Sequence, residues 1–198
     1  MAIETPKYKI IEKDRKFEIR EYDPYITAEV EVEGTDFRDA ANRGFSPLAR
    51  YIFGGNQGSR KISMTAPVSA QPVSEKIAMT APVAVSQQEN TSDNHYRVSF
   101  MMPSKFSLET LPEPTDRRVK FHSHPARTMA VIRFSGTFQQ PNFDHRLCQL
   151  RAWLKDKGYV EAGLPVIAGY DPPFTPWFLK HNEIMIEIER SNLSSGGN

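Results

Sequence analysis

Residues 26–35 read Ile-Thr-Ala-Glu-Val-Glu-Val-Glu-Gly-Thr, and this stretch decides the fold that the sequence predicts. Apolar and polar residues alternate over its first eight positions, which is the period of a strand with one face buried and the other in water. Gly34 and Thr35 end the strand, and Thr35 or Asp36 can cap a helix. Apolar residues then recur at helical spacing, as expected for one face of an amphipathic helix: Phe37, Ala40, Ala41, Phe45, Leu48 and Ile52.

The same order of elements returns 102 residues later in the chain. Residues 128–134 predict another strand, Gly136 and Thr137 end it, and Asn142 can cap a second helix. The apolar face of that helix consists of Phe143, Leu147, Leu150 and Leu154. Because each helix is followed by further alternating segments, we interpret the chain as a tandem duplication of a strand-helix-strand-strand unit. The alternative is that the two Gly-Thr pairs coincide by chance.

Strands outnumber helices in this interpretation, so the predicted fold class is α+β. The two units can join their sheets side by side with both helices on one face, or curl into a distorted antiparallel β-barrel. A fused sheet leaves no domain boundary, so residues 1–190 are expected to form a single domain, with 191–198 as a flexible tail. The other expected strands are 17–22, 61–68, 76–83, 96–102, 119–122, 166–170 and 183–189.

Two of these strands are near-identical octapeptides. The pattern Lys-Ile-x-Met-Thr-Ala-Pro-Val occurs at residues 61–68 and again at 76–83. Each copy alternates and ends in proline, which cannot donate a hydrogen bond to a neighbouring strand. We therefore expect each copy to be a strand that runs into an edge or a turn of the sheet.

Composition narrows the classes of function. The formal net charge is +1, and phosphate binding needs a basic surplus, so we expect no nucleic-acid partner. No apolar run approaches the roughly 18 residues that a membrane-spanning helix needs, and we expect no membrane partner. A single cysteine, Cys148, excludes an intrachain disulfide and a cysteine-based zinc cluster. These features predict a cytoplasmic globular protein.

The sequence lacks the motifs of common catalytic sites. It contains no G-x-S-x-G, no H-E-x-x-H, no P-loop and no G-x-G-x-x-G. His122 and His124 would face the same side of a strand and could share a metal ion, but two exposed histidines are the simpler interpretation. Cys148 lies beside Leu147 in a predicted helix and is expected to be a small buried side chain. We therefore predict no catalytic residues and no metal ligands.

Two linked groups of residues carry a resemblance to a known family. The first Lys-Ile-x-Met-Thr-Ala-Pro-Val segment follows Phe-Glu-Ile-Arg-Glu-Tyr at 17–22 and Tyr-Ile-Phe-Gly-Gly-Asn at 51–56. Ala-Gly-Tyr-Asp-Pro-Pro-Phe-Thr-Pro stands at 168–176, followed by Asn-Glu-Ile at 182–184. In this order, they closely resemble the SOUL/haem-binding protein family over nearly the whole chain. The resemblance implies the gyrase-inhibitor-like effector-binding fold, built from two repeated units.

The resemblance also implies a function and a site. The implied activity is binding of haem or related tetrapyrroles in an apolar groove beside the first helix, as a carrier or buffer without catalysis. Carried over by position, the haem-binding residues would be Asn42, Arg43, Phe45, Ala49 and Arg50. Lys180 and His181 would form a second edge of the groove. One basic position of the family falls on Asn42 here, and the neighbouring Arg43 can replace it.

One departure from the family bears on how iron would be held. Some members carry a histidine, proposed as an iron ligand, directly before the tyrosine of the first strand, and this chain has Glu21 there. Haem would then be held by apolar contact and propionate pairing, which suits exchangeable binding.

Two alternative functions remain open: an effector-binding domain for another planar or amphipathic ligand, and a haem-dependent peroxidase or a hydrolase.

Overall fold

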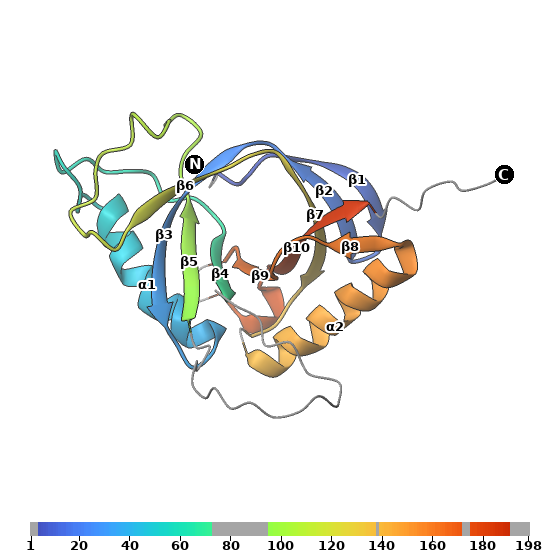
Figure 1. The fold of residues 1–198 in the computed structure, drawn as a ribbon. Coiled ribbons are helices and arrows are strands. Elements are labelled where there is room, and N and C mark those ends of the chain that lie inside the picture. Colours follow the sequence, from blue (N-terminus) through green and yellow to red (C-terminus); the bar gives the residue numbers. More distant parts are fainter. Residues whose placement is uncertain (1–3, 73–94, 138, 172–174, 191–198) are drawn as a thin grey trace, which may run out of the picture.

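The computed structural model describes residues 4–72, 95–137, 139–171 and 175–190, drawn as a coloured ribbon in Figure 1. These residues form ten strands and two long helices, which confirms the predicted α+β class. The strands are β1 (Tyr8–Asp14), β2 (Phe17–Tyr22), β3 (Tyr25–Glu33), β4 (Val68–Pro72), β5 (His95–Met101), β6 (Lys120–His124), β7 (Arg127–Phe134), β8 (Tyr159–Glu161), β9 (Val166–Gly169) and β10 (Asn182–Arg190). The helices are α1 (Phe37–Ile52), α2 (Gln140–Lys157) and the short 3-10 helix η1 (Trp177–Leu179).

One antiparallel sheet runs through the whole molecule. Its strand order is β1-β2-β7-β10-β9-β4-β5-β3-β6, and β8 pairs with β10 outside this path. The unit β3-α1-β4-β5 occupies one half and the unit β7-α2-β9-β10 the other, with β4 and β9 paired at the centre. Among the described residues no pairing joins β1 to β6, so the curved sheet in Figure 1 stays open. The two halves therefore have the repeated order that the sequence predicts.

Two connections cross from one half of the sheet to the other. After Asp23 and Pro24 the chain passes from β2 to β3, yet β2 pairs with β7, and β3 pairs with β5 and β6. After Pro125 and Ala126 it passes from β6 to β7 in the same way. We call β2 with β3 the first arch and β6 with β7 the second arch; both pass over the upper part of the molecule in Figure 1. Asp23 and Pro24, which join two strands as a hairpin turn would, thus lie in a crossover.

Both helices cover one face of the sheet, and the main core lies beneath them. α1 packs against β3, β4 and β5, while α2 packs against β7, β8 and β10. Because alternate strand residues point to the same face, every second residue of these strands contributes to this core. Its fully buried members include Ile19, Val30, Leu48, Ile52, Ala130, Ile132, Leu150, Ile184 and Ile186.

A glycine sets the close approach of α1 to the sheet. The helix begins after Asp36, whose side chain accepts a hydrogen bond from the backbone N–H of Asp39. At Gly44 a Cβ atom would lie 2.4 Å from the Cβ of Val98 on β5, a distance that real side chains do not adopt. The absence of a side chain at Gly44 therefore lets α1 pack directly on β5.

The first octapeptide copy differs from the prediction. Only its last residue, Val68, belongs to a strand, because residues 61–67 form a connecting segment with a single bridge between Thr65 and Glu4. Thr65 donates its hydroxyl hydrogen to the carbonyl of Met101, and the Ala66–Pro67 peptide bond is cis. A side-chain hydrogen bond and a proline here stand in place of the backbone hydrogen bonds between strands that the alternation predicted. The second copy and the predicted tail lie outside the described residues.

Candidate functional site

One side of α1 carries three of the side chains that the sequence predicted for a ligand groove. Asn42, Phe45 and Ala49 follow one another at helical spacing, but only Asn42 and Phe45 are exposed, whereas Ala49 is buried. Phe45 is 40% exposed and rests edge-on against Phe100 of β5, with ring centroids 5.4 Å apart. Phe53, directly after the helix, is 61% exposed and lies at the same spacing. We call these four residues the α1 strip.

Two arginines stand along one edge of the α1 strip, and they differ in their partners. The guanidinium of Arg43 lies 3.0 Å from the carboxylate of Asp39, one turn earlier on the helix. No ion pair joins Arg50 to any residue that the structure describes, although its charge contributes to lowering the pKa of the Asp116 carboxyl. That pKa is about 2, mainly because Arg118 donates hydrogen bonds to the carboxylate. Arg50 is therefore the arginine with more freedom to pair with a ligand.

Lys180 and His181 lie away from the α1 strip. They directly precede β10, which pairs with β7 in the half of the sheet covered by α2. The His181 ring stacks on Tyr170 at 4.4 Å, and its Nε2 lies 2.8 Å from a Glu183 carboxylate oxygen. His181 is thus engaged by the inner face of the sheet, and the structure does not bring this predicted second edge together with α1.

The inner face of the sheet, opposite the helices, holds a buried ionic cluster. Arg20 on β2 is fully buried, and the neighbouring residues Glu18 and Glu183 are each only 1% exposed. The guanidinium of Arg20 contacts Glu18 at 2.6 Å and meets both carboxylate oxygens of Glu183 at 2.9 Å. The cluster therefore ties β2 to β10 across the intervening β7.

Burial and hydrogen bonds shift the titration of this cluster. Burial alone would raise the pKa of Glu183, but hydrogen bonds from His181, Arg20 and Tyr170 outweigh it and lower that pKa to about 2. Burial raises the pKa of both Tyr22 and Tyr170 above the ordinary value for tyrosine. Tyr170 donates its hydroxyl hydrogen to Glu183 at 2.8 Å, and Tyr22 accepts one from Arg20 at 2.9 Å. Glu183 is therefore ionised, and Tyr22 and Tyr170 are neutral, near neutral pH.

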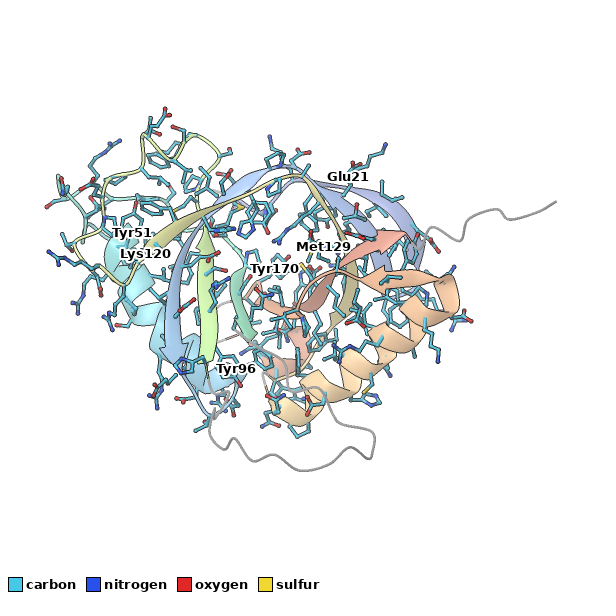
Figure 2. All side chains as sticks on the ribbon, in the orientation of Figure 1. Glu21, Tyr51, Tyr96, Lys120, Met129 and Tyr170 are labelled. Atoms are coloured by element: carbon cyan, nitrogen blue, oxygen red, sulfur yellow. The ribbon has the colours of Figure 1, made fainter. Side chains whose placement is uncertain are left out.

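A small cavity of about 60 Å³ adjoins this cluster on the inner face. Its walls come from both arches and from the central strands β4, β5 and β9. Figure 2 shows the labelled Met129 and Tyr170 in the space between the two halves. Tyr25 of the first arch stacks on His124 of the second, with ring centroids 4.8 Å apart. The lining residues used below are Tyr25, Glu29, Arg97, Met101, His124, Arg127, Met129 and Met185.

Glu29 is the acidic member of the cavity wall, and its partners are all protein groups. Thr27 donates its hydroxyl hydrogen to the carboxylate at 2.6 Å, while His124 lies at 3.4 Å and Arg97 at 3.5 Å. Burial would raise the pKa of Glu29, but hydrogen bonds from His124 and Thr27 with the charge of Arg97 lower it below its usual value. Glu29 is thus an ionised, paired carboxylate.

The inner-face cluster was not predicted from the sequence. Residues 17–22 alternate apolar and polar side chains, which normally marks a strand with its polar side in water. The overlooked signal is the alternation of Glu18, Arg20 and Tyr22, which share one face of β2. When such a face is buried, a partner strand can supply a further carboxylate for the arginine. Glu183 supplies it from 163 residues away.

Two further predicted features are placed clearly by the structure. Glu21, where some family members have histidine, is exposed on β2, and Figure 2 shows it well separated from α1. Cys148 is exposed, so the expectation that it is buried was wrong. It follows Leu147, which is buried, by one residue and therefore points about 100° around the helix from the core. Among described residues, no three His, Cys, Asp or Glu side chains gather as metal ligands.

No helix in the described parts of the chain has the length and apolar character needed to cross a membrane. The longest, α2, has 18 residues, and its surface carries several charged side chains, including Lys155 and Lys157.

Known proteins similar to this chain point to one family. A family model described as "SOUL heme-binding protein" matches residues 3–75 and 69–187. Heme-binding protein 1 of Xenopus laevis is 26% identical over 192 residues, which cover 91% of this chain and 94% of the relative. Heme-binding protein 2 of Homo sapiens is 28% identical over 202 residues, which cover 95% of this chain and 91% of the relative.

The fold is shared more widely than the sequence. The C-terminal domain of EcmrR superposes with a TM-score of 0.63 at 15% sequence identity, covering 92% of this chain and 98% of that domain. At such identity the likeness concerns the fold alone. It confirms the effector-binding-like architecture of two repeated units that the sequence resemblance implied.

Proposed function

The chain belongs to the SOUL heme-binding protein family, and from that premise we propose that it binds haem or a related tetrapyrrole on the α1 strip. The observation that carries this location is the exposure of Phe45 and Phe53 on one side of a helix whose edge carries Arg50. Large exposed aromatic side chains offer a flat apolar ligand contact area that water otherwise covers. The family membership supplies the ligand class, and the strip supplies a fitting surface.

The chemistry of the strip matches the two parts of a haem molecule. The apolar face of the macrocycle would lie on Phe45 and Phe53, with the buried Ala49 between them, while a propionate would pair with Arg50 at the solvent edge. A charge-assisted bond of this kind contributes about 1.5–3 kcal/mol at best, and solvent screening reduces it. Arg43 is the weaker cation for this role because Asp39 already engages it.

We propose a carrier or buffer and not an enzyme. The proposal is supported by the α1 strip itself, which contains no histidine and no acid-base pair among its described side chains. Without a strong axial protein ligand, binding would be exchangeable, which suits a protein that takes up and releases its ligand. A strip on one helix needs no second copy, so the proposed species is a monomer.

An absorbance titration tests the proposal. Haem added to the protein should give a saturable Soret shift at near one haem per chain, and weak changes without saturation would overturn it. Arg50→Ala should weaken binding about tenfold, or about 1.4 kcal/mol. Arg43→Ala should have a smaller effect, and Lys155→Ala on α2 is the matched control that should have none.

The same titration tests iron ligation. We expect a spectrum without bis-histidine character, and alanine at any one of five histidines should leave the Soret position unmoved. These are His95, His122, His124, His145 and His181. His181→Ala comes first, because the resemblance placed it nearest the groove, whereas its ring is bonded to Glu183 on the inner face. Loss of the Soret shift in one of these variants would replace the exchangeable carrier with a ligated haem protein.

A further inference from the structure

The cavity of the inner face is built by the duplication of the fold. Tyr22 and Tyr25 stand at the crossover of the first arch, and His124 and Arg127 occupy the positions 102 residues later at the crossover of the second. The arches cross-pair, so Tyr25 lies opposite His124 and Tyr22 opposite Arg127. All four line the cavity. The α1 strip takes no part in its wall, and the ionic cluster of Arg20 reaches it only through Tyr22 and Tyr170.

Arg127 brings an unused hydrogen-bond donor to this cavity. Its Nε is buried and has no hydrogen-bond partner, whereas one terminal nitrogen donates to the hydroxyl of Tyr25 and the other lies 3.7 Å from a Glu187 carboxylate oxygen. A buried donor without a partner is unfavourable, because it has lost its bonds to water. An acceptor in the cavity would remove that cost.

The charge of the wall favours an anion as that acceptor. Two arginines, Arg97 and Arg127, line the cavity with one carboxylate, Glu29. Glu29 is already paired with Thr27, His124 and Arg97, so its charge is compensated by its own side of the wall. Arg127 is the less engaged of the two cations, because its ion pair with Glu187 is long at 3.7 Å, and its planar guanidinium suits carboxylate geometry.

The rest of the wall combines polar side chains, such as Ser69 and Ser99, with three methionines, and the space is small. Met101, Met129 and Met185 contribute flexible thioether chains, which adapt to small apolar groups. A cavity of about 60 Å³ accommodates roughly four to six water-sized groups. These dimensions match a carboxylate with a short hydrocarbon tail and exclude a tetrapyrrole.

We propose that this cavity binds a short-chain monocarboxylate, with the carboxylate on Arg127 and the hydrocarbon tail among the three methionines. This site is separate from the α1 strip and does not depend on haem binding. Ordered water is the other occupant that a polar cavity of this size can hold, and the test below separates the two.

Methionine methyl groups provide a direct readout. The protein would be labelled with ¹³C at the methionine methyls and titrated with butyrate, with butyramide and butylammonium as probes of the same size. Butyrate should shift the signals of Met101, Met129 and Met185 saturably, with a dissociation constant of roughly millimolar, as small ligands allow. Met64, which is exposed and outside the cavity wall, should not shift and serves as the internal control.

Variants test the role of the guanidinium. Arg127→Gln should weaken butyrate binding at least tenfold, while Arg118→Gln, which removes an exposed arginine elsewhere, should leave it unchanged. The proposal is overturned if butyramide or butylammonium shifts the three methyl signals as strongly as butyrate does. It is also overturned if no probe shifts them, which would leave water as the occupant. Both results are read on the wild-type protein, so they stand even if Arg127→Gln does not fold.

Discussion

The inner face of the sheet and the outer face of α1 use charge in opposite ways. On the inner face Arg20 and Glu183 are buried, and their atoms meet at 2.9 Å in a bidentate pair. On α1, Arg50 stands in solvent beside exposed aromatic rings, with no ion pair to a described residue. Buried charges fix one geometry and are costly to separate, whereas exposed charges contribute little to stability and remain available to a ligand. We therefore expect substitutions on the two faces to act on different properties of the protein.

Breaking the ionic cluster should have the largest effect. Glu183→Gln removes one partner of the buried Arg20, and Arg20→Met leaves two buried carboxylates without their shared cation. Each change should lower the free energy of unfolding by about 3–5 kcal/mol, because a buried charge loses its bidentate partner. Urea unfolding followed by circular dichroism measures this loss.

The matched control for the cluster is an exposed pair. Asp116→Asn breaks the ion pair with Arg118, which is 69% exposed, and should cost less than about 1 kcal/mol. Equal losses in Glu183→Gln and Asp116→Asn would remove the distinction between the two faces.

Acid should weaken the inner face specifically. The pKa of Glu183 is about 2 in the folded protein against 4.5 for an ordinary glutamate, so its stabilising contribution is complete above about pH 4.5. That contribution, about 3 kcal/mol, should disappear as the pH falls from about 4.5 towards 2. Urea unfolding of the wild type and Glu183→Gln across this range should show the difference between them shrinking at low pH. A constant difference would mean that Glu183 does not titrate with folding.

A substitution at Gly44 tests how closely α1 packs against β5. Gly44→Ala places a methyl group against Val98, and overpacking of this kind should cost about 1–3 kcal/mol. Combining it with Val98→Ala should recover part of the loss, so the two changes should not be additive. Ser46→Ala, an exposed position of the same helix, is the control and should be nearly neutral. A neutral Gly44→Ala would show that α1 lies farther from β5.

Phe45 should separate stability from binding. A fully buried phenylalanine would cost about 3–5 kcal/mol on replacement by alanine. Because Phe45 is 40% exposed, Phe45→Ala should cost only about 1–2 kcal/mol while clearly weakening haem binding. Thermal unfolding and the Soret titration on the same sample measure both. A large loss of stability with unchanged haem affinity would assign Phe45 to the core instead of the strip.

Much of the fold could be predicted because its signals are local. Alternation at 26–33 and at 183–189, helical spacing from Phe37 to Ile52, and the repeated Gly-Thr pairs each depend on residues close together in sequence. They gave the α+β class and the duplicated order, and the strands β3 and β10 lie within a residue or two of their predicted bounds. The strand β1 was not predicted, since Tyr-Lys-Ile-Ile-Glu-Lys-Asp places two apolar residues in succession and breaks the alternation.

The inner-face site could not be predicted because its partners are distant in sequence. Arg20 and Glu183 meet only because β2 and β10 both pair with β7, and no local pattern distinguishes the crossover after Asp23 and Pro24 from a hairpin. The same holds for Tyr25 and His124, which are brought together by the pairing of β3 with β6. For the α1 strip, by contrast, the helix alone fixes the relative positions of Asn42, Phe45 and Ala49, which are three and four residues apart, so the sequence could place them on one side of the helix.

The location of haem is the most direct test of the contrast between the two faces. Ferric haem is paramagnetic and broadens the NMR signals of nearby amides, and its gallium analogue provides a diamagnetic reference. We predict broadening confined to α1 around Asn42, Phe45 and Arg50, with amides of the inner face around Thr27, Ser69 and Met129 unaffected. Broadening of the inner-face amides, with α1 unchanged, would contradict the account and place haem between the two halves of the sheet.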